Sequence, residues 1–325
     1  MRARAIDVRQ SIGRTLLTTI FRTGGKKLFP KGHVITEEEA KLIETEGMRQ
    51  VWVIELEEDD VGEQEAAMEV ARQIGNGSIE IRAAAGGRSN IFVTDACCVL
   101  VNSELLKDIN YSPSIAVATV WNWTYATVGQ RIATIKSTPL AVTKRQLDAV
   151  LSVAKERGPV LQARSMRSAA VAVLYCDPSD GERARQSFEK IMLQRLGRFA
   201  AGVSLTFRCA EREEDLSRAL EHLFRAKPTL VLIASTTAPA GPDDAVGRAM
   251  VGAGCRIEKF LAPVEPGSLL LLAYKDEIPV VSAPGCFRST RPNLVDLILP
   301  PLLAQCHISD KDIAGLGPVG LLTDP

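Results

Sequence analysis

From residue 169 onward the sequence alternates between apolar runs of strand length and amphipathic runs of helix length. The apolar runs include AAVAVLY, TLVLIAS and IPVVSA, and the runs between them carry apolar residues at helical spacing. Strands that are apolar on both faces need helices on both sides, as in a largely parallel sheet. The run LLLLAYKDEIPVV contains a hairpin turn at 275–277, which adds an antiparallel step. The sequence therefore predicts an α/β fold in which residues 168–306 form a three-layer α/β/α domain with a mostly parallel mixed sheet.

The loops that adjoin these predicted strands have an unusual composition. They are CDPSDGE at 176–182, STTAPAGPDD at 235–244 and APGCFRS at 283–289, while VEPGSLL precedes a strand at 264–270. In open α/β sheets, ligands bind beyond the carboxyl ends of the strands. Hydroxyls, free backbone N–H groups at helix starts and one arginine suit a phosphate or a polar heterocycle.

The last loop carries the clearest candidate for anion binding. Arg288 supplies a planar, permanently charged fork, and Ser289 and Thr290 supply hydroxyls. An apolar helix is expected to start after Thr290 and to turn its free N–H groups toward the same space. We therefore predict that the loop from Pro284 to Ser289 holds the anionic end of a ligand.

Each loop also has a purely structural interpretation. Ser179, with Glu182 three residues later, is explained as the N-cap of a helix, and Asp243 favours a positive helix end. The Pro-Gly pairs are explained as plain turns. Arg288 is then a surface residue, and Thr290 is only a cap.

The first 160 residues predict a mixed α+β region made of two small subdomains. RTLLTTIF and QVWVIEL alternate as strands do, and Thr36 with Glu39 forms a capping box ahead of a helix. A further helix is expected from Thr143 to Arg157. LQARSMRS is interpreted as the junction to the second domain, and residues 307–325 are interpreted as a C-terminal tail.

The charge balance excludes several classes of function. Lys+Arg and Asp+Glu both number 39, so no net basic field favours nucleic acid or an acidic membrane. No uncharged apolar run approaches the ~20 residues that span a bilayer. The basic N-terminus has no apolar segment of a secretory signal. We expect a cytoplasmic protein without nucleic-acid or membrane partners.

The cysteines and histidines predict neither a disulfide framework nor a metal site. The cysteines are odd in number, form no CxxC and fall mostly in apolar runs, which is typical of reduced, buried thiols. The three histidines are far apart in the sequence. The cysteines are Cys97, Cys98, Cys176, Cys209, Cys255, Cys286 and Cys306.

GLGPVG at 315–320 matches the G-x-G-x-x-G spacing of a dinucleotide-binding loop. The segment contains a proline, and the sequence leaves no room for the helix and strand that would follow such a loop. We interpret it as part of the tail and not as a nicotinamide site.

The run from LVLIAS to APGCFRS resembles the molybdopterin-binding domain of the MoaB/Mog type of molybdenum-cofactor biosynthesis proteins. That family shows a Gly/Ser/Thr loop followed by an acidic residue, a Pro-Gly before a strand, and a strand ending in Leu-Pro-Gly. The matching positions here are 235–244, 266–268 and 284–285. The variant Pro-Gly-Cys-x-Arg-Ser is similar to a subgroup in which this domain is often fused to a molybdenum-cofactor cytidylyltransferase-like domain. N-terminal segments such as GRTLLTTI and KGHVITEEEA also resemble that subgroup, so the resemblance covers nearly the whole chain.

The resemblance implies a protein that binds molybdopterin or the molybdenum cofactor and takes part in its biosynthesis, maturation or delivery. Its partners would be the pterin small molecule and a recipient molybdoenzyme or maturation protein, and a homo-oligomer is one arrangement to consider. The candidate cofactor-binding residues are Asp177, Ser179, Asp180, Ser235, Thr236, Thr237, Gly241, Asp243, Asp244, Pro266, Gly267, Ser268, Pro284, Gly285, Cys286, Arg288 and Ser289.

Two alternatives stay open because the loops depart from the family pattern. STTAPAG stands in place of the glycine-rich loop, and CDPSDGE stands in place of a Gly-Asp-Glu type of acidic loop. An enzyme of the same pathway would use a nucleotide and Mg²⁺ for adenylyl transfer or metal insertion, with Asp177, Asp180, Asp243 and Asp244 as candidate carboxylates. A non-catalytic scaffold with a decayed pocket would bind no pterin. The sequence assigns no catalytic residue.

Overall fold

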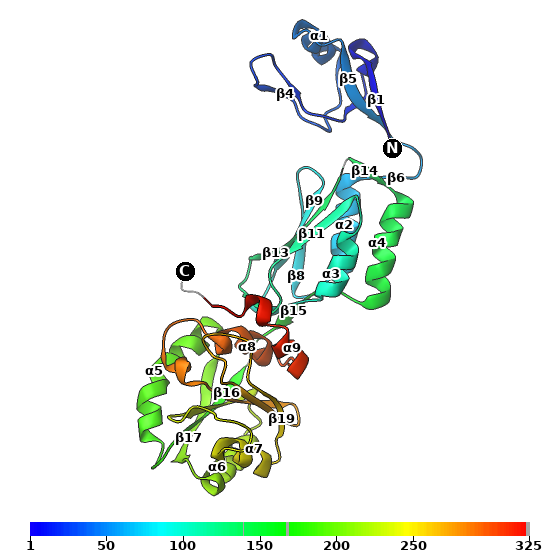
Figure 1. Cartoon of the computed structure of the whole chain (residues 1–325). Helices are drawn as coiled ribbons and strands as arrows, with labels where there is room; N and C mark the ends of the chain where they lie inside the picture. Colours follow the sequence, from blue (N-terminus) through cyan, green and yellow to red (C-terminus); the bar gives the residue numbers. More distant parts are fainter. Residues whose placement is uncertain (139, 167–168, 323–325) are drawn as a thin grey trace. The chain divides into compact units, whose positions relative to one another are not determined.

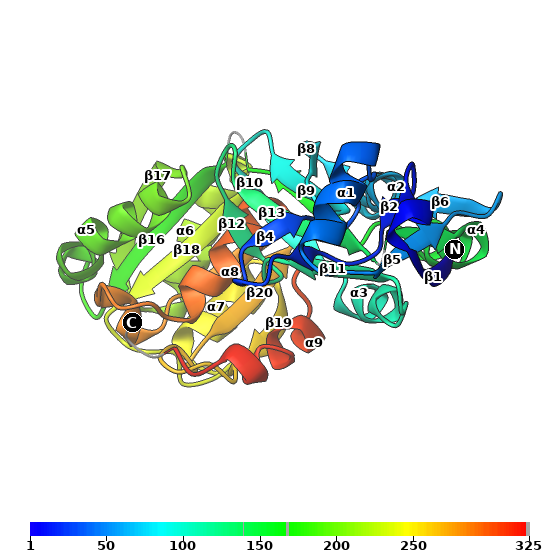
Figure 2. The same cartoon turned by 90° about the horizontal axis from the view of Figure 1, so that it is seen from above.

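Six strands between residues 170 and 282 form one sheet in the computed structural model, which describes residues 1–138, 140–166 and 169–322 (Figure 1). The strand order is β17-β16-β18-β21-β20-β19. The first four strands run parallel, and β20 pairs antiparallel with both β21 and β19. Figure 2 shows β16 and β18 side by side and pointing the same way. The strands are β16 (Ala170–Asp177), β17 (Gly202–Ala210), β18 (Leu230–Ser235), β19 (Arg256–Phe260), β20 (Leu271–Lys275) and β21 (Ile278–Ser282).

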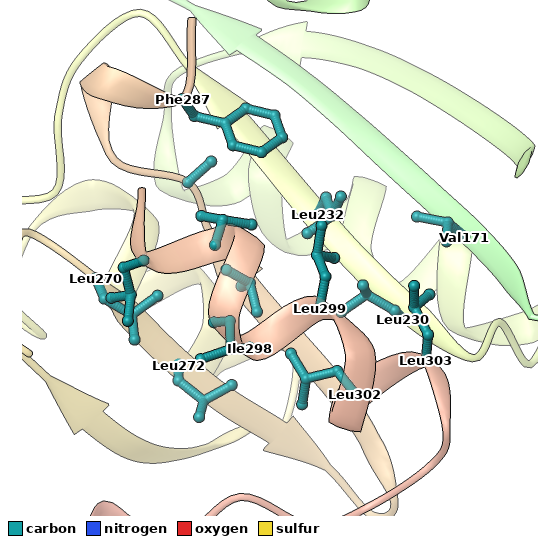
Figure 3. Packing of buried hydrophobic residues seen from close by; sticks show 14 of the residues in the cluster. Val171, Leu230, Leu232, Leu270, Leu272, Phe287, Ile298, Leu299, Leu302 and Leu303 are labelled. Atoms are coloured by element: carbon teal, nitrogen blue, oxygen red, sulfur yellow. The ribbon is translucent and has the colours of Figure 1, made fainter. Parts of the chain in front are cut away.

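Helices cover both faces of this sheet, as the apolar strands require. On one face the core contains side chains of α5 and α8, and on the other face it contains side chains of α6 and α7. Figure 3 shows Leu299 and Leu303 of α8 beside Leu232 and Leu230 of β18. The expected three-layer α/β/α arrangement with a mixed sheet is therefore present. The helices are α5 (Glu182–Arg198), α6 (Glu213–Arg225), α7 (Ala245–Gly252) and α8 (Leu294–Leu303).

The chain consists of two compact units, and the unit that contains this sheet also includes two short segments from the first half of the sequence. Unit 2 consists of Asp95–Leu100, Trp123–Thr127 and Arg164–Pro325. The early pieces belong to β10 (Cys97–Val101) and β12 (Thr124–Ala126), which pair antiparallel. Tyr125 of β12 meets the Phe199 ring edge-on, with the two centroids 5.4 Å apart. Cys98 is buried in the same core as α5 and α8.

The segment after residue 306, which we interpreted as a C-terminal tail, contains secondary structure and buried side chains. It contains α9 (Asp310–Ala314) and the 3₁₀ turn η3 (Gly317–Val319), and Ile308 and Ile313 are fully buried. Leu322 N–H donates to the Glu265 carbonyl at 2.9 Å, and Glu265 N–H donates to the Gly320 carbonyl at 2.7 Å. GLGPVG therefore packs against the strand-preceding loop and forms no βα dinucleotide turn, since its residues lie in a helix end and a 3₁₀ turn.

Unit 1 consists of Met1–Thr94, Val101–Asn122 and Val128–Ala163, and it is a mixture of small sheets and helices. One sheet has the order β11-β13-β9-β8, with α2 packed on β9 and β13. Another has the order β1-β5-β2, with α1 close by in the sequence. The capping box predicted at Thr36 is present. The helix expected from Thr143 to Arg157 begins at Lys144, and Thr143 is its N-cap in a capping box with Gln146.

The elements of the first half have these bounds: β1 (Arg2–Asp7), η1 (Val8–Ser11), β2 (Thr15–Leu16), β3 (Ile20–Phe21), β4 (Lys27–Phe29), α1 (Glu37–Thr45), β5 (Gln50–Glu55), β6 (Asp60–Gly62), α2 (Glu63–Ile74), β7 (Gly75–Gly77), β8 (Ile79–Ala84), β9 (Arg88–Val93), α3 (Ser103–Asn110), β11 (Ile115–Thr119), β13 (Arg131–Ser137), β14 (Ala141–Thr143), α4 (Lys144–Arg157) and β15 (Leu161–Ser165).

Two expectations about the chain's organisation stay predictions. The junction expected at 161–168 includes Arg167 and Ser168, which lie outside the described residues, and the independent folding of residues 168–306 is a prediction for experiment. Within the described residues, no helix has the length and apolarity needed to cross a membrane.

Candidate functional site

The carboxyl edge of the unit 2 sheet gathers four loops. Cys176 of β16 lies opposite Ser235 of β18, and Ile233 of β18 lies opposite Ser282 of β21, so these strands end at one edge. Because β20 runs the other way, its first residue, Leu271, lies opposite Ser282 at the same edge. The loops after β16, β18 and β21 and the loop before β20 therefore leave the sheet side by side.

Asp177 is a buried carboxylate that organises the first of these loops. Its Oδ1 accepts from Ser179 N–H (2.9 Å) and Ser179 Oγ (2.8 Å), and its Oδ2 accepts from the N–H groups of Arg183 (2.9 Å) and Ala184 (3.2 Å) in the first turn of α5. Burial alone would raise the pKa of Asp177, but the hydrogen bonds from Ser179 and Ala184 outweigh it and hold that pKa well below its usual range. Asp177 is therefore an ionised carboxylate whose oxygens accept hydrogen bonds from the loop after β16 and the first turn of α5.

The prediction that Ser179 is the N-cap of α5 is wrong. The capping position belongs to Gly181, which has a φ of 85° and makes no side-chain cap. A Cβ on Gly181 would come within 2.4 Å of the Tyr175 carbonyl oxygen, so the tight return of the chain requires glycine. Ser179 and Asp180 instead line a groove of about 690 Å³ beside β17 and α6.

The loop after β18 begins with a hydrogen bond between the buried Ser235 and the half-buried Glu211. Ser235 is 2% exposed, and its Oγ donates to Glu211 Oε2 at 2.9 Å while accepting from Thr237 N–H at 3.0 Å. Glu211 directly follows β17, and its N–H donates to the Asp177 carbonyl at 2.6 Å. These contacts join the ends of β16, β17 and β18. The side chain of Thr237 faces solvent, and Thr236 is half-buried.

The acidic end of this loop caps α7. Asp244 Oδ1 accepts from Gly247 N–H at 2.8 Å, and Oδ2 accepts from Ala240 N–H at 2.8 Å. Asp243 is exposed, and its carbonyl accepts a hydrogen bond from Arg248. Both carboxylate oxygens of Asp244 thus accept hydrogen bonds from the backbone. Gly241 lies between Ala240 and Asp244, and a Cβ placed there would have no atom within 4 Å.

The Pro-Gly loop before β20 lies against the start of α8. Leu294 N–H donates to the Pro266 carbonyl at 3.1 Å. Gly267 has a φ of 124°, and a Cβ there would come within 2.8 Å of the Leu294 nitrogen. Gly267 therefore allows the backbone of this loop to pack directly against the start of α8. Ser268 donates from Oγ to Glu265 at 3.2 Å and lines a separate cavity of about 270 Å³.

The loop after β21 forms a short 3₁₀ helix, η2 (Gly285–Arg288), with Pro284 before it and Ser289 after it. Arg288 is exposed, its Nε donates to the Gly285 carbonyl at 3.2 Å, and its guanidinium lies 5.6 Å from the Phe188 ring centroid. It forms no ion pair within the described residues. Cys286 is half-buried, and burial raises the pKa of its thiol.

The prediction that a helix starts just after Thr290 is wrong. α8 begins at Leu294, and its N-cap is Asn293, whose Oδ1 accepts from Val295 N–H at 3.0 Å. Asp296 completes a capping box by accepting from Asn293 N–H at 2.9 Å. The free N–H groups of this helix are therefore used by its own capping residues and by Pro266, and they do not face a ligand.

Arg195 of α5 is the main residue that sequence reasoning missed. Its side chain is 1% exposed, pairs through Nη1 with Asp296, and donates through Nη2 to the carbonyls of Ser289 and Arg291, the latter at 2.8 Å. Its guanidinium also lies 5.1 Å from the Phe287 ring centroid. Arg195 thus ties the loop after β21 to α5 and to the first turn of α8. The sequence contained a signal, since Arg195 lies on the apolar stripe of α5 between Met192 and Leu196.

Four buried polar atoms beside this loop have no hydrogen-bond partner among the described residues. They are Ser282 Oγ, Arg195 Nε, Asn293 Nδ2 and Asp296 Oδ1. Native proteins leave few such atoms unpaired, and clusters of them are typical of places where water or a ligand completes the network. The buried polar atoms of the carboxyl edge that lack a hydrogen-bond partner among the described residues therefore gather near the end of β21.

The two better-buried carboxylates of this edge are committed to the backbone. Among the described residues, no group of three His, Cys, Asp or Glu side chains is placed to hold a metal ion. Asp177 and Asp244 use both carboxylate oxygens on backbone N–H groups. What the edge offers to a ligand is the exposed Arg288, the hydroxyls of the loop after β18, and the turn Pro284–Ser289.

Comparisons with solved structures return proteins of molybdenum-cofactor biosynthesis at low similarity. A molybdenum cofactor biosynthesis protein from Pyrococcus furiosus shares 12% identity with a TM-score of 0.26, over 94% of this chain and 64% of that one. A molybdopterin biosynthesis MoeA protein from Pyrococcus horikosii shares 10% identity with a TM-score of 0.32, over 94% of this chain and 75% of that one. This chain thus spans less than two thirds of the first protein's length. TM-scores this low do not establish a shared fold, and both names describe those proteins alone.

No family model matches the chain, and no curated protein matches it either. The MoaB/Mog resemblance and the fused subgroup therefore remain interpretations of the sequence motifs.

Proposed function

We propose that this protein binds molybdopterin or the molybdenum cofactor at the carboxyl edge of the unit 2 sheet, with the phosphate-bearing end of the ligand on Arg288. The observation that carries the proposal is the state of that arginine. It is exposed, it forms no ion pair within the described residues, and it sits on the turn that follows β21. A guanidinium fork of this kind matches the geometry of a phosphate.

The surroundings of Arg288 support its use as a fixed anchor. The rings of Phe188 and Phe287 lie 6.3 Å apart, with the guanidinium of Arg288 on the first and that of Arg195 on the second. Arg195 holds the following residues through the carbonyls of Ser289 and Arg291. An anchor whose backbone is already held loses less conformational entropy when it binds.

The remaining loops would contact the heterocycle. Thr236 and Thr237 bring hydroxyls at the end of β18, and the neighbouring strand ends with Ser282, whose Oγ has no partner among the described residues. The motif resemblance supports a pterin over other phosphate-bearing molecules. In this role the protein carries the cofactor or hands it to a molybdoenzyme or maturation partner.

The alternative of a Mg²⁺-dependent enzyme has less support at this edge. Of the four candidate aspartates, Asp177 and Asp244 are committed to backbone N–H groups, and Asp180 and Asp243 are exposed. Magnesium is usually bound through one or two carboxylates together with substrate phosphates. Release of pyrophosphate from ATP that depends on both Mg²⁺ and molybdopterin would favour the enzyme, and its absence beside ligand binding would favour the carrier.

Calorimetric titration with molybdopterin tests the proposal. Arg288→Ala should weaken binding by about 1.5–3 kcal/mol, the range for a hydrogen bond to a charged group, with little change in thermal stability. Arg288→Lys should restore only part of this loss, because lysine keeps the charge but not the fork. Arg198→Ala is the matched control, since Arg198 is exposed in the last turn of α5, whereas the first turn of that helix adjoins the loop after β16 at the carboxyl edge. Unchanged affinity in Arg288→Ala would remove the assignment.

A further inference from the structure

β17 is an edge strand of unusual length and composition. It is paired on one side only, with β16, and it lies at the end of the six-stranded sheet. Its nine residues, GVSLTFRCA, contain no proline or lysine and a single charge, Arg208. Edge strands expose a row of unpaired N–H and C=O groups, and proteins usually protect long ones with lysine, proline or a covering element. The opposite edge strand, β19, is approached by α9, whose Asp310 N–H donates to Glu258 at 3.1 Å.

The helix next to this edge carries a charge gradient along its length. The first turn of α6 contains Glu213, Glu214 and Asp215, and its last turn contains His222 and Arg225. The outer side chains of α6 and residues of β17, including Phe207, line the groove of about 690 Å³. Phe207 is 36% exposed and contacts the ring of His222, with 5.2 Å between centroids.

We propose that this edge binds a second copy of the same chain, with the two β17 strands antiparallel across a two-fold axis. Such an axis reverses the strand and the helix together, so the two α6 helices lie antiparallel on the same face of the joined sheet. The acidic first turn of each helix then faces the basic last turn of the other. A strand of another protein could form the same backbone hydrogen bonds with β17. Only a second copy of this chain, however, also brings the acidic turn of one α6 next to the basic turn of the other at two symmetric contacts.

The pattern of ion pairs within one chain identifies the cation that is left for the partner. Arg212 and Arg218 share Asp215, Arg248 pairs with Glu213, and Arg208 pairs with Glu182. Glu214 is therefore the acidic residue of the first turn that forms no ion pair within the described residues. Arg225 also lines the groove but forms no ion pair within the described residues. In the pair of chains, Arg225 meets Glu214 in the first turn of the other α6, and the two helices fill the grooves.

This arrangement has a consequence for the candidate site. The two-fold axis turns the parallel strands of one copy opposite to those of the other. The two carboxyl edges therefore open at opposite edges of the continuous sheet. Pairing through β17 leaves the loops after β18 and β21 accessible, whereas Ser179 and Asp180 line the groove that the partner's helix fills.

Sedimentation velocity of the full chain over a range of concentrations tests the proposal. The unmodified protein should form a reversible dimer, and Arg225→Glu should raise its dissociation constant at least ~10-fold by replacing attraction with repulsion at both helix contacts. Lys311→Glu makes the same charge change on α9, at the other edge of the sheet, and should leave the dissociation constant unchanged. A protein that stays monomeric at every concentration, or a dimer that Arg225→Glu does not weaken, overturns the proposal.

Hydrogen exchange read by mass spectrometry locates the contact. Amides of 202–210 should exchange more slowly in the dimer than after dilution to monomer, and in Arg225→Glu they should exchange fast at both concentrations. A dimer in which the exchange of 202–210 does not depend on concentration would place the interface elsewhere and contradict the pairing of β17.

Discussion

Replacing Arg195 should destabilise unit 2 far more than replacing an exposed arginine that also forms an ion pair. The Arg195 side chain is 1% exposed and that of its partner Asp296 is 14% exposed, so both charges are largely removed from water. Arg195→Ala leaves the Asp296 carboxylate and the carbonyls of Ser289 and Arg291 without their shared donor. Breaking a buried pair by removing one partner typically costs about 3–5 kcal/mol, because the remaining charge stays buried.

The control is Arg218, which pairs with Asp215 at 3.1 Å but has 72% of its side chain exposed. Exposed pairs of this kind contribute about 0–1 kcal/mol, so Arg218→Ala should have little effect. Arg195→Lys should recover part of the loss by keeping the charge, whereas Arg195→Met should recover packing only.

Native-state hydrogen exchange of β18 amides measures the opening free energy of the sheet core, and amides at 289–291 report the loop itself. We expect Arg195→Ala to lower the first by about 3–5 kcal/mol and to accelerate exchange in the loop. The reasoning is refuted if Arg195→Ala costs no more than Arg218→Ala, since the loop would then be held by the sheet and by α8 alone.

Three further predictions concern the loops and the thiols. The folded pKa of Asp177 lies below its unfolded value of ~3.9, so the stability that this carboxylate contributes is present above ~pH 4 and is lost as pH falls through the folded pKa. Asp177→Asn should lower the free energy of unfolding by about 1–3 kcal/mol at pH 7. Urea unfolding at several pH values should also show that the stability of this variant depends less on pH in the acid range than that of the unmodified protein. Gly267→Ala should lower the free energy of unfolding by at least about 1–3 kcal/mol, because residues other than glycine rarely adopt its φ and a Cβ would clash with Leu294. Gly241→Ala should change the free energy of unfolding by less than ~0.5 kcal/mol in the same assay, and equal effects of the two substitutions would contradict the packing argument. Burial raises the pKa of Cys97 to about 11, so alkylation of this thiol at pH 8 followed by mass spectrometry should track unfolding, and rapid labelling of the native protein would contradict its burial.

The sheet of unit 2 was predictable from the sequence because its central strands are buried on both faces. A run such as LVLIAS has no polar face to expose, and it appears as β18, whose six residues are all buried. The hairpin between β20 and β21 was signalled by the charged turn at 275–277. Such local signals fix the type of each element and, through the rules for parallel sheets, the edge at which the loops meet.

The ends of the helices were less predictable, for two different physical reasons. The start of α8 carried a usable signal, since Asn293 and Asp296 form a capping box after a proline, and Thr290 was a weaker choice. The start of α5 carried a misleading one. Its first N–H groups are satisfied by Asp177, which lies on the preceding strand, so the local pattern of Ser179 and Glu182 matched a capping box that does not form.

Contacts between distant parts of the sequence could not be derived at all. The antiparallel pair of β10 and β12 belongs to unit 2 through contacts of Tyr125 and Cys98, and no local pattern of residues 95–127 indicates this packing. Arg195 is similar, because its partners lie about a hundred positions away along the chain. The role of Arg288 is of another kind, since the sequence named the residue and only a ligand can test it.

Mass spectrometry of the small molecules released from the full chain, purified from a host grown with molybdate, tests the central claim most directly. The account predicts a molybdopterin or one of its oxidised derivatives in the unmodified protein, close to one per chain, and a clear loss of it from Arg288→Ala but not from Arg198→Ala. Protein that is folded and carries no pterin, even after incubation with free molybdopterin, would contradict the account.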